Sequence, residues 1–462
     1  MMRIFGHYVP SSMLWLGLTE FCILFSAFVT GYVLRYSDLG QILDGTFPHY
    51  SQAFLYAGSM LLAMLALGLY EREAIIEPRT VIVRLVASLL LGFAILASIV
   101  FVSRATDVWR SGVVIACLLS VAGILASRWV FLMLANLRPF LKRVMVIGAG
   151  PRAELIERHA GRPSNGALQI VGYLRTGDAE NSIAAAISQS QVPSITAFCL
   201  AHEVEEIIVA MEERRGRLPM EDLLNSRMHG IRVVDEVQFW ERETGRVDIA
   251  RLTPGWLVFG DGFAKSQWQR SQKRLLDIAA SLFVLCLTAP IMLLTALAIK
   301  LEDGGPILYV QERVGLDGRA FRLFKFRSMS INAESDGRAR WASDGDPRVT
   351  RVGRVTRRTR IDELPQLFNI LRGDMSFIGP RPERPSFVHD LAQQIPYYAE
   401  RHRVKPGLAG WAQLNYPYGA SSDDAARKLE YDLYYIKNCS VFLDFLIMIQ
   451  TLRVVVWGQG AR

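Results

Sequence analysis

Two adjacent acidic residues, Asp362 and Glu363, stand in a segment that is otherwise rich in arginine. Pro365 follows them and opens an apolar run, which predicts a helix start, because proline suits the first helical turn. A helix start carries positive partial charge and free N–H groups. Full positive charges surround the pair: Arg357, Arg358, Arg360, Arg372 and Arg381. The segment therefore predicts an anion site, and phosphate fits it best.

The acidic pair allows more than one interpretation. One carboxylate can act as a nucleophile while the other acts as a base, or the two can hold a divalent metal that binds phosphates. Alternatively, the pair belongs to a capped helix with surface ion pairs, since Asp and Glu are common in first helical turns. Spacing alone leaves these interpretations open, and the neighbouring motifs favour chemistry.

Those motifs are KFRSM (Lys325 to Met329), RIDELPQL, GDMSFIGPRP (Gly373 to Pro382) and VKPGLAGWAQLN (Val404 to Asn415). In this order they resemble the bacterial sugar transferases, the monotopic polyprenyl-phosphate hexose-1-phosphate transferases. The resemblance runs from about Gln267 to the C-terminus. The tail LNYPYGASSDDAARKLEYDLYYIKN further resembles the branch associated with exopolysaccharide export systems that accompany PEP-CTERM protein sorting.

The resemblance implies transfer of hexose-1-phosphate from a UDP-sugar, UDP-glucose or UDP-galactose, to undecaprenyl phosphate, the first membrane step of exopolysaccharide repeat-unit synthesis. Asp362 would be the nucleophile that forms a phospho-aspartate and releases UMP. Glu363 would deprotonate the lipid phosphate or help to bind the metal. The expected cofactor is Mg²⁺ or Mn²⁺, because a hard cation suits carboxylate and phosphate oxygens. We also expect the nearby arginines to lower the pKa of Asp362.

The resemblance also assigns phosphate-binding positions, where arginine offers a two-pronged donor that lysine lacks. The matching residues are Lys325, Arg357 and Arg381. One family arginine is missing, because this chain has Tyr416 and Pro417 where many relatives have Gly-Arg. Three residues are candidates to replace it: Arg403, Lys405 and Arg427.

Composition favours a membrane protein, since 51% of the residues are hydrophobic. The net charge of +8 lies mostly in the C-terminal part and suits anionic lipids and phosphorylated substrates. Nucleic acid is the weaker alternative, and no nucleic-acid-binding motif supports it. The five cysteines and seven histidines form no metal or disulfide pattern.

Four apolar runs open the chain, and each approaches the ~20 residues that span a bilayer. They are Met13 to Leu34, Ala53 to Tyr70, Val81 to Val102 and Val113 to Leu134. Basic residues in the connecting segments mark the cytoplasmic side. They predict that the N-terminus and everything after Pro139 lie in the cytoplasm, at the bacterial inner membrane.

The segment RVMVIGAGPRAELIERHA (Arg143 to Ala160) predicts a buried strand, a glycine turn at Gly148 and Gly150, and a helix. Strand-like pieces at Gln169 to Leu174, Glu206 to Met211 and Ile231 to Val234 extend this into a Rossmann-like domain. The acidic residue that a dinucleotide site needs at the end of the second strand is missing, since that strand ends in Arg-Thr-Gly. Scaffolding, homodimer formation and nucleotide sensing are the favoured roles.

A further apolar run from Leu275 to Ile299 contains Pro290, preceded by Ala289 where the family usually has serine. Proline removes a backbone hydrogen bond and bends a helix. The run can be a kinked span or a re-entrant hairpin. Basic residues on both flanks favour the hairpin, because both ends then stay in the cytoplasm, and the resemblance implies it too.

The predicted fold is thus a membrane protein of mixed α and α/β class. It has a four-helix transmembrane region (1–140), a Rossmann-like domain (141–262) and a mainly α catalytic domain with a re-entrant helix (263–462). One alternative is a membrane-tethered NAD-dependent nucleotide-sugar oxidoreductase or dehydratase, which the lack of a Tyr-x-x-x-Lys pair disfavours. The other is a non-catalytic export scaffold.

Overall fold

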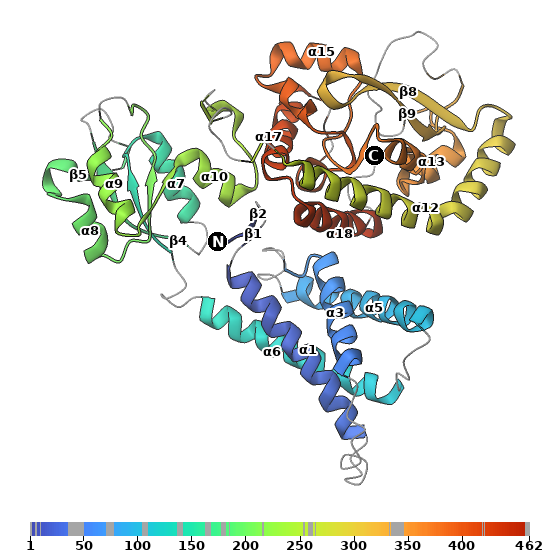
Figure 1. Cartoon of the computed structure of the whole chain (residues 1–462), viewed down its shortest axis with the longest axis horizontal. Coiled ribbons are helices and arrows are strands. Elements are labelled where there is room, and N and C mark those ends of the chain that lie inside the picture. The colour runs from blue at the N-terminus through green and yellow to red at the C-terminus, as the bar shows by residue number, and fades with distance from the viewer. Residues whose placement is uncertain are drawn as a thin grey trace. The chain divides into compact units, whose positions relative to one another are not determined.

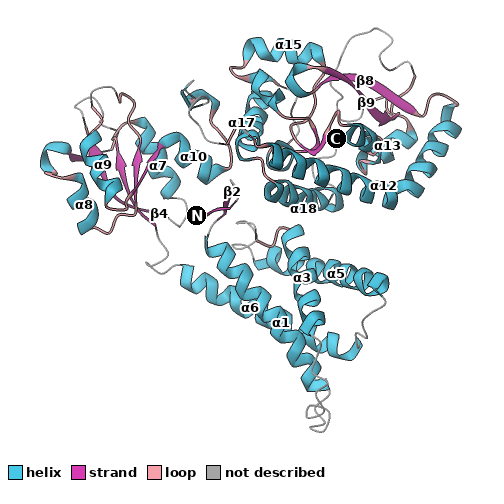
Figure 2. Ribbon diagram, in the orientation of Figure 1, coloured by secondary structure: helices cyan, strands magenta, loops and turns pink. Residues whose placement is uncertain are grey.

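A computed structural model of the chain is shown in Figures 1 and 2. The chain has three parts: a region of apolar helices, a small α/β domain and a larger C-terminal domain. A short antiparallel pair, β1 (Met2–Ile4) and β2 (His7–Val9), precedes the first helix. The residues described are 2–4, 7–9, 11–35, 50–70, 78–103, 110–135, 142–161, 168–176, 182–183, 185–214, 217–252, 255–256, 262–263, 265–331, 333, 346–417, 419 and 421–457.

Four apolar helices form the first region: α1 (Ser11–Arg35), α3 (Tyr50–Ala66), α5 (Pro78–Ser103) and α6 (Arg110–Ala135). Three of them contain stretches long and apolar enough to cross a membrane: Met13–Leu34, Val81–Val100 and Gly112–Phe131. Helix α3 has 17 residues, a length of about 25 Å at the lower limit for a span. All four predicted apolar runs are therefore helical, and the second ends earlier than expected.

A buried ion pair joins α1 to α6 within this region. The Nε of Arg128 lies 2.8 Å from Oε1 of Glu20, and both side chains are almost fully buried. Arg128 also donates to the carbonyl of Leu69, and the hydroxyl of Tyr70 donates to Glu20. Charges buried among apolar helices are stable only when they are paired. The cluster therefore ties the turn after α3 to both helices.

The α/β domain contains a five-stranded parallel sheet in the order β5-β4-β3-β6-β7. Its elements are β3 (Lys142–Ile147), α7 (Pro151–Ala160), β4 (Leu168–Arg175), β5 (Ile187–Ser188), α8 (Ile195–Ala201), β6 (Glu206–Val209), α9 (Met220–Met228), β7 (Arg232–Asp235) and α10 (Glu236–Thr244). The predicted strands therefore exist and pair in parallel, and the predicted mixed α/β class is confirmed.

Both faces of this sheet are covered, because alternate residues of a strand point to opposite sides. Val144 and Val146 of β3 pack with residues of α7 and α10. Met145 and Ile147 pack with residues of α8 and α9. Figure 2 shows the strands between these helices. The near-continuous apolar sequence of β3 follows from burial on both sides.

The C-terminal domain is mainly helical and belongs to a compact unit that includes Gly245–Arg462. Its elements are α12 (Gln267–Asp303), β8 (Leu308–Val314), β9 (Ala320–Phe326), α13 (Arg351–Arg358), α14 (Gln366–Arg372), β10 (Ser376–Ile378), α15 (Pro385–Gln394), β11 (Gly407–Ala409), α16 (Trp411–Asn415), α17 (Ser422–Asn438) and α18 (Val441–Trp457). Residues 245–252 pack here too, since Val247 lies in the main core beside Leu429 and Leu433 of α17.

Helix α12 holds the predicted membrane run in one 37-residue helix with Pro290 inside it. Ser266 and Gln269 cap its start, and Gly304 ends it in a left-handed conformation. Figure 1 shows the helix changing direction between its two halves. The hydroxyl near the proline comes from Thr288, which donates to the carbonyl of Val284, so Ala289 does not leave the bend without a nearby hydroxyl.

Both ends of α12 are attached to the same domain. Near its start, Arg274 donates to the carbonyls of Ile370 and Leu371, and Asp277 accepts from Ser376 and from the backbone N–H of Phe377. At its end, Glu302 accepts from two backbone N–H groups at the start of α13. Both ends of the helix therefore contact the same domain.

Candidate active site

The acidic pair lies in a single 3₁₀ turn, Ile361–Glu363, between α13 and α14. Arg360 enters the turn with a left-handed backbone (φ 58°), which is uncommon for a residue with a Cβ. Pro365 stands directly before α14, as predicted. The turn buries both carboxylates, with Asp362 8% and Glu363 7% exposed. The alternative of a capped helix with surface ion pairs does not fit this burial.

Glu363 is held by three cations. Its Oε1 accepts from Arg381 at 2.7 Å and from Lys325 at 3.2 Å, and Arg360 lies 3.6 Å from Oε2. Burial acts to raise the pKa of Glu363, but Arg381, Lys325 and Arg360 outweigh it and hold that pKa well below its usual range. Glu363 is thus a permanent anion that organises the surrounding cations.

Asp362 differs from its neighbour, because within the described part of the chain its carboxylate makes no ion pair or hydrogen bond. Burial and the negative charge of Glu363 raise the pKa of Asp362 to about 6, against the lowering effects of Lys325, Arg381 and Arg357. The arginines act on Asp362 in the expected direction, but burial and Glu363 outweigh them, so the pKa is lowered overall only at Glu363. A carboxylate with this pKa is largely ionised at neutral pH and is available for attack.

Asn369 connects the turn to the strand that carries Lys325. Its side chain is fully buried on α14, accepts from the N–H of Phe324 at 3.0 Å and donates to the carbonyl of Arg322 at 2.7 Å. These two bonds satisfy a backbone N–H and a carbonyl of β9, which among the described strands pairs with β8 alone. Asn369 is therefore a positioning residue, and sequence reasoning missed it because a lone asparagine in a helix carries no motif.

We expect Asn369→Leu, which keeps the number and branching of the side-chain heavy atoms, to lower both stability and turnover. The substitution leaves a buried N–H and a buried carbonyl unpaired, at a cost of roughly 2–4 kcal/mol. The measurement is thermal unfolding in detergent together with product formation. Gln394→Leu, at an exposed position of α15, is the control. An Asn369→Leu protein with normal melting temperature and normal turnover would contradict this role.

Arg357 approaches Asp362 from the last turn of α13. Its positive charge lowers the pKa of Asp362 and of Asp346. Helix α13 is placed by Gly353, where an added Cβ would lie 2.0 Å from the carbonyl oxygen of Ser328. Ser328 belongs to the KFRSM motif. The close approach of this glycine therefore brings Arg357 and Lys325 to the same turn.

Arg381 reaches Glu363 from the segment after β10. Strand β10 pairs in parallel with β11, which brings the GDMSFIGPRP and VKPGLAGWAQLN motifs side by side. Arg401 donates to the carbonyl of Arg381 at 3.1 Å and pairs with buried Asp432 of α17 at 2.8 Å. Three of the predicted phosphate-binding residues therefore meet at the acidic pair: Lys325, Arg357 and Arg381.

Where many relatives have the missing arginine, this chain makes a different contact. The hydroxyl of Tyr416 donates to Asp424 of α17. Lys428, one turn further along α17, interacts electrostatically with Arg381, and burial lowers the pKa of Lys428. Arg427, one of the predicted replacements, pairs with Glu430, and its charge also acts on Tyr416. Lys428 is thus a second basic residue near this position, and sequence reasoning missed it.

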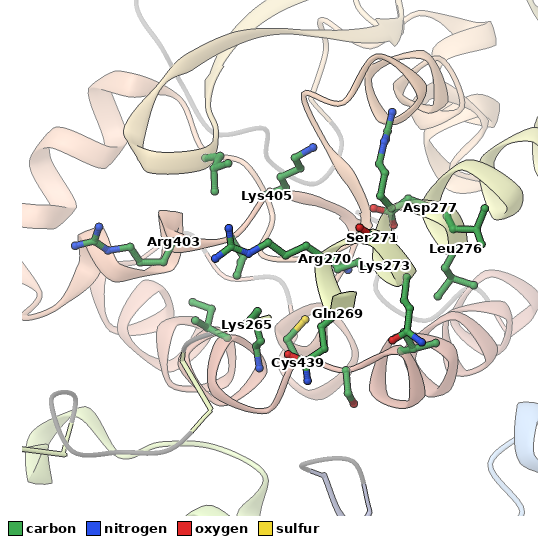
Figure 3. A pocket seen from close by; sticks show the side chains of 18 of the residues that line it. Lys265, Gln269, Arg270, Ser271, Lys273, Leu276, Asp277, Arg403, Lys405 and Cys439 are labelled. Atoms are coloured by element: carbon green, nitrogen blue, oxygen red, sulfur yellow. The ribbon is translucent and has the colours of Figure 1, made fainter. Parts of the chain in front are cut away.

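The structure does not bring Arg403 and Lys405 to the acidic pair. Both line a separate cavity near the start of α12, shown in Figure 3. Arg403 is exposed and pairs with Glu400 at 3.1 Å. Lys405 is influenced by Arg274 and Lys273 rather than by Asp362 or Glu363. Their predicted role in binding the substrate at the acidic pair therefore has no support in this geometry.

Of the two carboxylates, Asp362 is the one that could bind a metal ion. Among the residues that the structure describes, no group of three or more His, Cys, Asp or Glu side chains could hold a metal ion. Both oxygens of Glu363 face cations. Mg²⁺ commonly uses one or two carboxylates together with substrate phosphates and water. The residues fit an ion that is shared with a diphosphate, with Asp362 as its protein ligand.

The glycine turn of the α/β domain follows β3. Gly148 has a φ of 120°, and an added Cβ would lie 2.6 Å from the carbonyl oxygen of Ala210. Gly150 precedes α7, and the backbone N–H groups of Ser182 and Ile183 both donate to the carbonyl of Ala149. Close packing against the end of β6 accounts for the glycine at 148 without a ligand.

Comparison with known proteins supports the resemblance. The family model described as "Bacterial sugar transferase" matches residues 268–458. An N-acetylgalactosaminephosphotransferase that acts on undecaprenyl phosphate, from Aeromonas hydrophila, is 50% identical over 49% of this chain and 52% of its own length. An undecaprenyl-phosphate glucose phosphotransferase from Komagataeibacter xylinus is 33% identical over 70% of this chain and 61% of its own length.

This chain thus matches only about half to three fifths of those two relatives. A shorter relative, an uncharacterized sugar transferase from Bacillus subtilis, is 41% identical over 41% of this chain, and the match covers 90% of that protein. The residues that the family model matches include every element around the acidic pair. The predicted family is confirmed, and the chain belongs to the bacterial sugar transferases.

Proposed function

We propose that the C-terminal domain transfers hexose-1-phosphate from a UDP-sugar to undecaprenyl phosphate through a phospho-aspartate at Asp362. The observation that carries this proposal is the contrast within the pair, where Glu363 is bound by three cations and Asp362 is not. An oxygen of Asp362 attacks the sugar-proximal phosphorus, the bond to the other phosphate breaks, and UMP leaves. An oxygen of the lipid phosphate then attacks the same phosphorus and releases the carboxylate.

The surrounding charges suit this reaction. Phosphoryl transfer depends mainly on positioning and on stabilising the negative charge of the transition state. Lys325, Arg357 and Arg381 supply positive charge around Asp362. The low pKa of Glu363 makes it a poor base, so we assign it the role of holding Lys325 and Arg381 in place rather than that of deprotonating the lipid phosphate.

The direct test is incubation of the purified full chain with undecaprenyl phosphate, Mg²⁺ and a panel of labelled UDP-sugars. We expect a labelled lipid and released UMP with UDP-glucose or UDP-galactose. UDP-N-acetylgalactosamine belongs in the panel, because the 50% identical relative is named for that sugar. Failure of every donor, with folded protein, would refute the proposal.

Removal of divalent metal should abolish turnover. The donor diphosphate carries charge that Mg²⁺, or Mn²⁺ in its place, would neutralise when bound to Asp362 and phosphate oxygens. We expect EDTA to stop UMP release and added Mg²⁺ to restore it. Residual activity in EDTA equal to that in Mg²⁺ would exclude a metal role.

We also propose that α12 is a re-entrant hairpin and that the C-terminal domain lies on the cytoplasmic side of the bacterial inner membrane. The support is the attachment of both ends of α12 to one domain, through Arg274 and Asp277 at the start and Glu302 at the end. A crossing helix would place a bilayer of ~30 Å between these contacts. UDP-sugars are cytoplasmic substrates in this proposal.

Single cysteines at Gln267 and Leu301, two exposed positions on either side of the bend, test this topology. The background protein has no native cysteines. We expect an impermeant thiol reagent to label neither introduced cysteine in intact spheroplasts and to label both introduced cysteines in inverted vesicles. A cysteine at Asp38, between the first two apolar helices, is expected to show the reverse. Labelling of Gln267→Cys and Leu301→Cys from opposite sides would establish a span.

A further inference from the structure

A second basic site lies away from the acidic pair. The cavity at the start of α12 has a volume of about 1500 Å³ and is walled by the first turns of α12, residues 400–405 and the start of α18. Helix α14 separates it from Asp362. A Cβ added to Gly373, at the far end of α14, would lie 3.7 Å from both Arg274 and Lys405, and seven helical residues rise about 10 Å.

The charged residues in the wall of this cavity are mostly basic. Its basic residues are Lys265, Arg270, Lys273, Arg274, Arg403 and Lys405, and its acidic residues are Asp277, Asp317 and Glu400. Several of these charges are already engaged. Lys273 pairs with Asp444, Arg403 pairs with Glu400, and Asp277 accepts from Ser376 and Phe377.

Two cations remain without an ion pair or a side-chain hydrogen bond among the described residues, and these are Arg270 and Lys405. Burial lowers the pKa of Lys405, and so do the charges of Arg274 and Lys273. Figure 3 shows the Arg270 side chain in the middle of the cavity, whereas Arg403 lies at its edge. An anion bound in this cavity would supply negative charge near these two cations.

The rim of the cavity is apolar and exposed. Leu275 on α12 is 71% exposed, and Phe445 on α18 is 47% exposed. Beyond the rim, α12 continues with exposed Leu282, Phe283 and Leu287, which is the face that the proposed hairpin presents to lipid. A ligand that fits these surfaces has an anionic head beside a hydrocarbon chain.

We propose that this cavity binds the phosphate headgroup of an anionic membrane phospholipid, with Arg270 and Lys405 at the phosphate and the acyl chains along Leu275 and Phe445. The site is distinct from the transfer site at Asp362. A soluble phosphate would make no use of the exposed apolar rim. The bound lipid would hold the start of α12, the segment around Lys405 and α18 together at the membrane surface.

The test uses the purified full chain in mild detergent, titrated with phosphatidylglycerol and followed by native mass spectrometry. We expect one retained phosphatidylglycerol in the wild type and at least tenfold weaker retention in R270Q/K405Q. The double variant R217Q/R227Q removes the same charge at exposed positions of the α/β domain and should behave as the wild type. R270K/K405R should also retain the lipid, because both charges stay.

Further arms distinguish the sources of phosphate. Inorganic phosphate and phosphatidylcholine should not displace phosphatidylglycerol. Displacement by inorganic phosphate at equal concentration would overturn the proposal in favour of a free-phosphate site. Displacement by undecaprenyl phosphate alone would overturn it in favour of the acceptor lipid. If R270Q/K405Q does not fold, the single variant Arg270→Gln, at an exposed position, takes its place in the test. Unchanged retention of phosphatidylglycerol in that variant would also refute the proposal.

Discussion

Asp362→Asn should abolish sugar-phosphate transfer while leaving the fold intact. The amide keeps the shape of the carboxylate but cannot attack phosphorus, and loss of a nucleophile typically lowers turnover by about 10⁴-fold or more. The environment of Asp362 supports a neutral replacement, since burial and Glu363 already raise the pKa of Asp362 to about 6. The melting temperature is therefore expected to be close to that of the wild type.

Two measurements check this result. The first is UMP release with and without undecaprenyl phosphate. The second is trapping of labelled protein after incubation with a UDP-sugar alone, which should occur in the wild type and not in Asp362→Asn. Asp390→Asn, at an exposed position on α15, should retain both signals. Labelled Asp362→Asn protein would show that the covalent intermediate forms elsewhere.

Glu363→Gln should destabilise the protein as well as inactivate it. The substitution leaves Lys325 and Arg381 facing each other without their shared anion, and loss of one partner from a buried ion cluster costs about 3 kcal/mol or more. For a domain of this size we expect the melting temperature to fall by roughly 6–12 °C. Thermal unfolding followed by circular dichroism measures the change.

A double-mutant cycle separates this effect from a general loss of packing. Lys325→Met removes one of the two crowded cations, so Glu363→Gln should cost less in that background than in the wild type. Turnover should be low in Lys325→Met with or without Glu363→Gln, because the charge of Lys325 also acts on Asp362. Equal losses of melting temperature in the two backgrounds would mean that Lys325 and Glu363 are not coupled.

Much of this site follows from the sequence because its parts are local or carried by motifs. The turn before Pro365, the position of Lys325 in KFRSM and the arginine in the Pro-Arg-Pro run are all readable from the residues. The parallel sheet of the α/β domain also follows from short apolar runs that alternate with helical segments. The structure then places Lys325 and Arg381 on the same carboxylate.

Other features depend on long-range packing and have no local signal. The opposite pKa shifts of Asp362 and Glu363 arise because the cations bind only one of two adjacent residues. Lys405 belongs to the VKPGLAGWAQLN motif. Its side chain nevertheless lies near the end of α14 that is farther from the acidic pair. Asn369 acts through the backbone of β9, which no spacing rule predicts.

Helix α12 is also a wall of the catalytic core. Val284 and Leu285, in the middle of the apolar run, pack against the cluster that contains Leu367 and Ile370 of α14. Arg274 meanwhile covers the last carbonyls of α14. A water-soluble fragment made by trimming the hydrophobic segment would therefore lose one side of the support beneath Asp362. Engineered versions of this transferase have to retain the hydrophobic half of α12.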